Sequence, residues 1–290
     1  MLAITLSLVL GLNVQAAQES SSLSRLPDGR YHTDVTIDGR GPWPFIVDTG
    51  ASHTAIADVL AFEFGYVPSD IRSDVQTLTE EIRLERLQLG RLQAVGLTQA
   101  GINAVVIDTP TDLDLQMFGL LGNDMFAGHI VRFDLAAGTL TAGAASPRYS
   151  DASLNTSFGV PIGQAILEGA REPVSVMIDT GSARTIVNSM LYGQMRRDGL
   201  LLSYDVLGAS RIGRLERSSR TVRLENFRIG GVCGSDLQAV SADVDMFRAL
   251  GWTRRPAMIV GVDALADAVL TLDHETGRVE ISPADGQRCD

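Results

Sequence analysis

Two identical tripeptides, Asp-Thr-Gly, stand at positions 48–50 and 179–181, and each follows a short apolar run, FIV in the first case and VMI in the second. A carboxylate at the end of a buried strand is unfavourable unless it is paired, hydrogen-bonded or neutralised. Two such carboxylates facing each other can share one proton, so that one stays ionised and the other neutral. The ionised group could then take a proton from water while the neutral group donates to an amide carbonyl.

A single Asp-Thr-Gly is also a common strand-ending turn, because Asp and Gly are frequent turn residues. The duplication favours the chemical interpretation, since both copies place the aspartate after an apolar strand. Glycine lets the backbone turn and bring amide N–H groups close to the carboxylates. The hydroxyls of Thr49 and Thr180 could tie the two loops together across a twofold axis.

The tripeptides belong to a longer internal repeat of three blocks in the same order. FIVDTGASHTAI matches VMIDTGSARTIV, IRLERLQLG (82–90) matches VRLENFRIG (222–230), and LLGNDMFAGHIVRFDLAAGTL matches IVGVDALADAVLTLDHETGRV. An ordered set of this kind indicates gene duplication. Gly122 and Gly261, in the third block, are expected to pack beside the aspartate loops, where a side chain would collide.

The repeat predicts a first lobe over residues 26–143 and a second over 158–290, joined by a Ser- and Ala-rich linker at 144–157. Within each copy the apolar stretches are short and alternating, and turn signals such as Asp38-Gly39 separate them. The expected fold class is therefore all-β: two barrel-like lobes related by an internal pseudo-twofold duplication, with a few short helices.

The N-terminal segment 1–17 contains an apolar run followed by small residues, as in a signal peptide, which predicts a periplasmic or secreted protein or an N-terminal membrane anchor. The formal net charge of −11 argues against nucleic acid as a partner. Cys233 and Cys289 could form a disulfide after export, or be small buried hydrophobic residues in a reducing compartment. The four histidines are scattered, so no metal site is expected.

The chain resembles the aspartic peptidases, both the bilobal pepsin-like enzymes and the retropepsin-like ones. The resemblance rests on two apolar residues followed by Asp-Thr-Gly-Ala/Ser and on a later apolar-apolar-Gly. The resemblance covers nearly the whole mature chain and implies an acid-protease-type fold and a polypeptide substrate, with no cofactor. It implies that Asp48 and Asp179 are the catalytic pair, and a monomer should suffice because both lie on one chain. It also implies two smaller sets: Thr49, Gly50, Thr180 and Gly181 as loop supports, and Ala51 and Ser182 as candidate substrate-binding residues.

The resemblance also implies a hairpin over the substrate in the first lobe, somewhere within residues 71–87. That stretch lacks the glycines typical of such a cover and has no tyrosine like that of the pepsins. One alternative is a non-catalytic peptide-binding protein that keeps the fold without turnover. Another uses Ser52 and His53 as nucleophile and base, but neighbours in an extended strand point to opposite faces, and no G-x-S-x-G motif is present.

Overall fold

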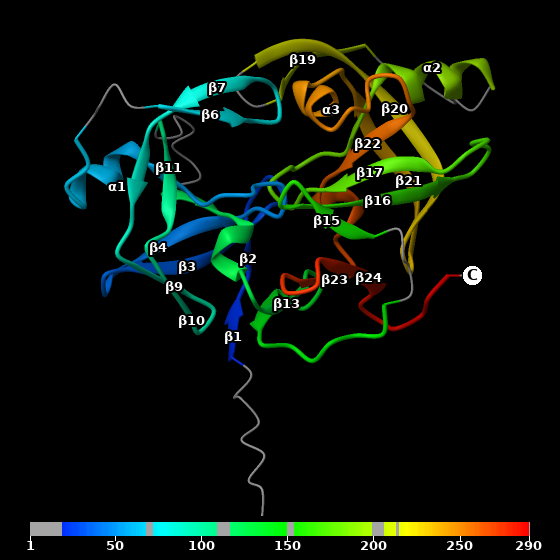
Figure 1. The fold of residues 1–290 in the computed structure, drawn as a ribbon. Helices are drawn as coiled ribbons and strands as arrows, with labels where there is room; N and C mark the ends of the chain where they lie inside the picture. The colour runs from blue at the N-terminus through cyan, green and yellow to red at the C-terminus, as the bar shows by residue number, and fades with distance from the viewer. Residues whose placement is uncertain are drawn as a thin grey trace, which may run out of the picture.

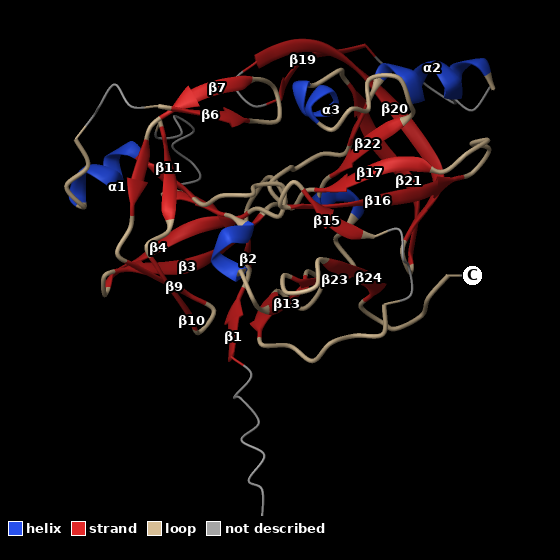
Figure 2. Ribbon diagram, in the orientation of Figure 1, coloured by secondary structure: helices blue, strands red, loops and turns tan. Residues whose placement is uncertain are grey.

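The computed structural model describes residues 19–67, 72–108, 117–149, 154–198, 206–212 and 215–289, so the expected signal segment 1–17 lies outside the described residues. Two lobes built mainly of strands lie side by side, the first coloured blue to green and the second green to red (Figure 1). Helices are few and short (Figure 2). The expected all-β, two-lobed architecture with barrel-like sheets is confirmed.

The first lobe is centred on a nine-stranded sheet, in which the strands follow the order β10-β9-β3-β4-β12-β5-β11-β8, with β2 paired to β3. Strands β6 and β7 form a separate two-stranded hairpin. The elements of this lobe are β2 Ser24–Arg25, β3 Tyr31–Ile37, β4 Arg40–Val47, β5 Ala55–Ala57, α1 Asp58–Glu63, β6 Ser73–Gln76, β7 Glu81–Leu84, β8 Arg86–Gln88, β9 Arg91–Ala94, β10 Leu97–Ala100, β11 Asn103–Ile107, β12 Gly119–Leu121 and the 3₁₀ helix η1 Asn123–Phe126.

The second lobe continues a thirteen-stranded sheet whose order ends β15-β16-β17-β22-β18-β21-β20-β19. Its elements are β15 Asn155–Ser157, β16 Val160–Leu167, β17 Val174–Ile178, β18 Ile186–Val187, α2 Ser189–Arg197, β19 Val206–Ile212, β20 Leu215–Ile229, β21 Val232–Ser241, α3 Asp245–Ala249, β22 Ala257–Val260, the 3₁₀ helix η2 Val262–Ala264, β23 Ala268–Asp273 and β24 Arg278–Pro283. Strand β15 lies within the expected linker and pairs with β16 and β24.

The lobes share the other end of that sheet, which runs β1-β14-β13-β23-β24. Its first-lobe strands are β1 Glu19–Ser22, β13 Ile130–Asp134 and β14 Thr139–Ala142. Strand β13 pairs antiparallel with β23 over five residues, from Ile130 opposite Asp273 to Asp134 opposite Val269. Because β13 and β23 come from matching blocks of the sequence repeat, the shared sheet fixes the two copies about their common axis.

The strands form where the sequence alternates apolar and polar residues or is apolar throughout. β3 shows the alternation of a sheet with one buried face, whereas all four residues of β22 are buried. One buried apolar cluster extends through both lobes and the shared sheet. The predicted turn at Asp38-Gly39 lies between the paired strands β3 and β4, and Ala137-Gly138 and Thr276-Gly277 also lie between paired strands. None of the helices in the described residues is long and apolar enough to cross a bilayer.

Candidate active site

Each aspartate stands directly after a strand, in a loop that a neighbouring parallel strand supports. Asp48 follows β4, and its N–H donates to the carbonyl of Leu121 at the end of β12, at 3.1 Å. Asp179 follows β17, and its N–H donates to the carbonyl of Val260 at the end of β22, at 3.0 Å. The duplicated sequence therefore gives the same local geometry twice, and the two loops meet between the lobes (Figure 1).

Reciprocal threonine hydrogen bonds join the two loops. The N–H of Thr49 donates to Oγ1 of Thr180 at 3.0 Å, and the N–H of Thr180 donates to Oγ1 of Thr49 at 3.1 Å. Each hydroxyl also donates to a strand of the opposite lobe: Thr49 to the carbonyl of Ile178 at 2.9 Å and Thr180 to that of Val47 at 2.7 Å. Both threonines are 1% exposed. Four buried hydrogen bonds therefore hold the loops in a fixed relative position.

The glycines let the two carboxyl groups approach each other. Gly50 donates its N–H to Oδ1 of Asp48, and Gly181 donates to Oδ1 of Asp179, both at 2.9 Å. A Cβ on Gly50 would lie 2.5 Å from Cγ of Asp179, and one on Gly181 would lie 2.3 Å from Cγ of Asp48. Each glycine thus faces the aspartate of the other lobe. With both glycines in place, the Asp48 and Asp179 side chains are hydrogen-bonded to each other.

Burial raises the pKa of both carboxyl groups. At Asp179, which is 6% exposed, the charge of Asp48 and the hydrogen bond to Asp48 add to burial, so that its pKa lies well above the usual range. At Asp48 burial also raises the pKa, but the hydrogen bond from Asp179 and the N–H of Gly50 partly offset that effect. Both pKa values are raised, so the two carboxyl groups retain a proton between them and titrate as a pair.

Two more aspartates, Asp124 and Asp263, accept hydrogen bonds from the threonines that end the two aspartate loops. Asp124 Oδ1 accepts the N–H of Thr54 at 2.9 Å and its hydroxyl at 2.6 Å. In the second lobe, the two oxygens of Asp263 accept the N–H of Thr185 at 3.0 Å and its hydroxyl at 2.7 Å. Both threonines are fully buried, so these bonds satisfy polar groups that water cannot reach.

Sequence reasoning missed this second pair, although a signal exists. Both aspartates stand two residues after the glycine of the third repeated block, Gly122 in one copy and Gly261 in the other. A Cβ on Gly122 would lie 2.4 Å from the carbonyl carbon of His53, and one on Gly261 would lie 2.6 Å from that of Arg184. The collision predicted for a side chain at these glycines is therefore present in both lobes.

The repeat is broken beside the site at Asn123, where the second copy has Val262. The Asn123 amide donates to the carbonyl of Thr49 at 2.7 Å and to that of Gly159 at 2.9 Å, so it fastens the first aspartate loop to the second lobe. Asn123 also lines a cavity of about 250 Å³ with Ser52 and His274, and neither Asp48 nor Asp179 lines it. This cavity is separate from the carboxyl pair.

The residues that follow the two motifs support the loops through their backbones. Ala51 donates its N–H to the carbonyl of Asp48 and accepts from the N–H of Asn123. Ser182 donates its N–H to the carbonyl of Asp179 and accepts from the N–H of Val262. Both residues are partly exposed beside the carboxyl pair, and their expected role in binding substrate stays a prediction.

The expectation that Ser52 and His53 point to opposite faces is wrong. Residues 51–54 form a bend before β5 rather than a strand, and Ser52 Oγ lies 2.9 Å from Nδ1 of His53. His53 is exposed at this bend, whereas Asp179 is buried and Asp48 is half-buried. The contact joins two neighbouring residues of the exposed bend, and it does not involve the Asp48–Asp179 pair.

Cys233 and Cys289 form a disulfide with a Cα–Cα distance of 5.9 Å. It joins β21 to the C-terminal segment of the second lobe and does not contribute to the carboxyl pair. No three His, Cys, Asp or Glu side chains of the described residues gather as a metal site would require.

Comparison with known proteins agrees with this arrangement. The family model described as aspartyl protease matches residues 33–125, a segment that contains Asp48, its Asp-Thr-Gly motif and Asp124. The search of curated proteins returned no significant relative.

Proposed function

We propose that this chain is an aspartic endopeptidase that uses Asp48 and Asp179 as a single catalytic pair, a proposal that the match of residues 33–125 to the aspartyl protease family model supports. The observation that supports this proposal most directly is the hydrogen-bonded carboxyl pair, held by four threonine hydrogen bonds. The second lobe supplies the other half of the pair through the repeat.

The two aspartates have different roles in this mechanism. Asp48, the ionised partner, acts as general base and takes a proton from a water molecule bound between the carboxyl groups. Asp179, whose pKa lies well above the usual range, donates its proton to the carbonyl oxygen of the scissile peptide bond. The hydroxyl adds to the carbonyl carbon and gives a tetrahedral diol. Collapse of the diol, with a proton passed to the amide nitrogen, breaks the C–N bond without a covalent enzyme intermediate.

The proposed substrate is an extended polypeptide lying in the space between the lobes. A peptide in β conformation is held by backbone hydrogen bonds and presents alternate side chains to pockets on either side. We further propose that the mature protein works as a monomer outside the cytoplasm, which agrees with the signal-like N-terminus and the disulfide.

The test compares Asp48→Asn and Asp179→Asn with wild type on a library of peptides of mixed sequence. Because each carboxyl group has its own role in proton transfer, either substitution should lower kcat by about 10²–10⁴-fold. Asp34→Asn makes the same change on an exposed position of β3 and serves as the matched control. Near-normal turnover by either dyad variant would contradict the proposal. Wild-type binding of a statine peptide without cleavage of any library member would instead favour a non-catalytic peptide-binding protein.

A further inference from the structure

Arg30 stands opposite Asp48 on the neighbouring strand. Strands β3 and β4 pair antiparallel with His32 opposite Ile46, and the same register, continued two residues beyond this pair, brings Arg30 opposite Asp48. Residues directly opposite on antiparallel strands place their side chains on the same face, with Cβ atoms about 4.5–5.5 Å apart. The register therefore brings a guanidinium group to the side of the sheet that carries the carboxyl group of Asp48.

The turn that ends in Arg30 is closed by its own hydrogen bonds and lies close to the second lobe. The N–H of Leu26 donates to the carbonyl of Arg30 at 2.7 Å, and the N–H of Gly29 donates to the carbonyl of Leu26 at 2.9 Å. Leu26 is buried, and a Cβ on Gly29 would lie 3.6 Å from Cγ2 of Val262. These contacts restrict the positions that the Arg30 side chain can adopt.

Asp28 holds the guanidinium group of Arg30. Its Oδ2 accepts from Nε of Arg30 at 2.8 Å and lies 2.6 Å from Nη2, and its Oδ1 accepts from the backbone N–H of Arg30 at 3.1 Å. The Arg30 side chain is 22% exposed, so water and salt screen its charge only in part. Burial raises the pKa of Asp48, and the charge of Arg30 is one of the effects that offset this rise.

The second lobe has an apolar residue at the equivalent position. Ile162 lies opposite Met177 in the β16–β17 pair, and the same register brings Val160 opposite Asp179. Val160 is 5% exposed and belongs to a buried apolar cluster. At Asp179 burial is the largest effect, and the charge of Asp48 adds to it, so that the pKa lies well above the usual range. The repeat thus places a cation opposite one aspartate and a valine opposite the other.

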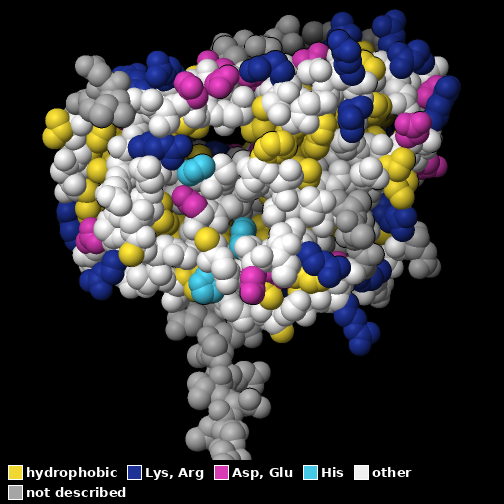
Figure 3. Space-filling model, viewed as in Figure 1, with side chains coloured by type: hydrophobic (Ala, Val, Ile, Leu, Met, Phe, Trp, Pro, Cys, Tyr) yellow, Lys and Arg dark blue, Asp and Glu magenta, His cyan; other side chains and the backbone are white. Residues whose placement is uncertain are grey.

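Several other charged or titratable side chains surround this turn, from both lobes: Arg25, Tyr31, His32, Arg184, Asp263 and Asp267. Arg184 and Asp263 lie 3.6 Å apart as an ion pair, so their charges largely cancel. On the face that Figure 3 shows, basic and acidic side chains are interspersed, with no continuous patch of one sign. A nearby cation therefore affects the carboxyl pair more than the overall charge of the protein does.

We infer that Arg30 is a positioning residue for the proposed reaction: it stabilises the negative charge on Asp48 and so leaves the shared proton on Asp179. The inference rests on the proposed function, since it assigns the base and the acid within that pair. Duplication alone would give two equivalent aspartates. Arg30 removes this equivalence, so the base and the acid keep fixed positions relative to a bound peptide.

The first experiment titrates the pair by NMR of labelled aspartate carboxyl carbons, which needs no turnover. Arg30→Gln removes the cation, so both apparent pKa values of the pair should rise by about 0.5–1 unit, and the Asp48 signal should move toward that of a protonated group. Asp28→Asn leaves the cation without its neutralising partner, so both values should fall. Arg30→Lys keeps the charge and should titrate close to wild type.

The opposite directions distinguish an effect of charge from an effect of structure. Arg30→Gln and Asp28→Asn break the same ion pair, so a merely structural role would shift the titration in the same direction in both variants or would not shift it. Either of these results would overturn the inference.

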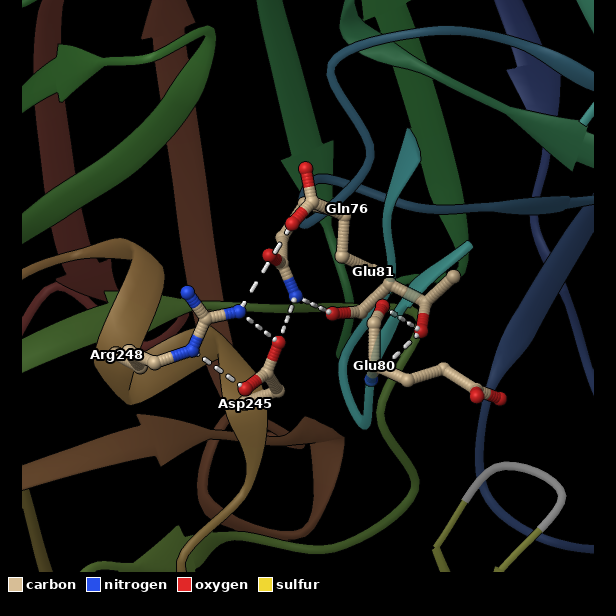
Figure 4. A network of polar contacts seen from close by, with 6 residues as sticks. Gln76, Glu80, Glu81, Asp245 and Arg248 are labelled. Atoms are coloured by element: carbon tan, nitrogen blue, oxygen red, sulfur yellow. Dashed lines mark hydrogen bonds and ion pairs between the residues drawn. The ribbon is translucent and has the colours of Figure 1, made fainter. Parts of the chain in front are cut away.

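A comparable ion pair on α3 supplies the matched control. Arg248 donates to Asp245 from Nε at 2.8 Å and from Nη2 at 2.7 Å. The β6–β7 hairpin of the first lobe contacts α3 here: the N–H of Met246 donates to the carbonyl of Leu78 at 3.2 Å, and Gln76 Nε2 donates to Asp245 Oδ2 at 3.3 Å (Figure 4). Arg248→Gln and Asp245→Asn make the same changes of charge at this contact, and each should leave the titration of the carboxyl pair within about 0.2 unit of wild type.

The second experiment measures kcat/KM against pH on a cleaved peptide. Both limbs of the profile should move to higher pH in Arg30→Gln and to lower pH in Asp28→Asn, as in the NMR titration. Identical profiles for wild type and both variants would overturn the role of Arg30 and leave the proposed function standing. A wild type that cleaves no peptide would instead overturn the proposed function, and with it the assignment of base and acid.

Discussion

The substitution Thr180→Val isolates the hydrogen bonds that join the two aspartate loops. Valine keeps the shape of threonine but removes the hydroxyl that accepts from Thr49 N–H and donates to the carbonyl of Val47. Thr49 and Val47 are 1% and 2% exposed, so water does not replace the hydroxyl. A buried polar group without a partner costs about 1–3 kcal/mol, and two such groups predict a loss of about 2–6 kcal/mol in the free energy of unfolding. That is a large share of the 5–15 kcal/mol that is typical of a folded protein.

The assay is urea unfolding followed by circular dichroism near neutral pH. Thr180→Ser keeps the hydroxyl and should lose much less stability than Thr180→Val. Thr36→Val removes a hydroxyl that donates to the Gln93 side chain at an exposed position, so its effect should stay within about 0.5 kcal/mol. The double variant Thr49→Val/Thr180→Val should lose less than the sum of the single variants, since both hydroxyls belong to one network.

Two results would refute this reasoning. One is a Thr180→Val protein as stable as Thr180→Ser, which would mean that the loops find other partners for the freed N–H and carbonyl groups. The other is strict additivity of the two threonine substitutions, which would mean that the four hydrogen bonds act independently.

Three further predictions concern the carboxyl pair. The pKa of Asp179 is raised in the folded state. Between the usual pKa of an aspartate and this raised pKa, the folded protein therefore binds more protons than the unfolded chain. The free energy of unfolding of the wild type should consequently fall as pH rises through that window. Asp179→Asn should abolish part of that fall, and melting temperatures of both proteins between about pH 4 and pH 7 measure it. The rate of peptide hydrolysis should follow a bell-shaped pH profile, and both limbs should lie at a higher pH than the usual pKa of an aspartate. A rate that kept rising into alkaline pH would indicate another nucleophile. Activity per chain should be constant on dilution, and rescue of activity by mixing Asp48→Asn with Asp179→Asn chains would show instead that the site forms between chains.

Much of the candidate site could be predicted because its requirements are local and occur twice. Three consecutive residues in the sequence supply these requirements. They are an aspartate after an apolar strand, a threonine that can form a hydrogen bond across the twofold axis, and a glycine that leaves space for the opposite carboxyl group. The same holds for Gly122 and Gly261, whose neighbours leave no space for a side chain. Duplication converts a weak local pattern into a specific one, since it predicts that the two copies meet.

Other features were not predictable, because they depend on backbone conformation or on segments that are distant in sequence. The contact between Ser52 and His53 required the actual bend at 51–54, where a strand was expected. The repeat makes Asp124 and Asp263 equivalent, but it does not identify the hydrogen-bond partner of Asp124, which is Thr54, 70 positions away. The hairpin at 73–84 could be expected from sequence, but its attachment to α3 could not, because no local pattern relates Leu78 to Met246.

The sequence by itself determined the two aspartates, the repeat that pairs them and the β-rich lobes that carry them, since each of these follows from residue type and spacing along the chain. The tertiary structure decided that burial and the nearness of Asp48 raise the pKa of Asp179, and that the hairpin contacts α3 of the second lobe, where the N–H of Met246 donates to the carbonyl of Leu78. Both depend on burial and on distances across the lobe boundary. Those quantities arise only when the chain folds, because free energies of desolvation and pairing are properties of the surroundings of a group and not of the group alone.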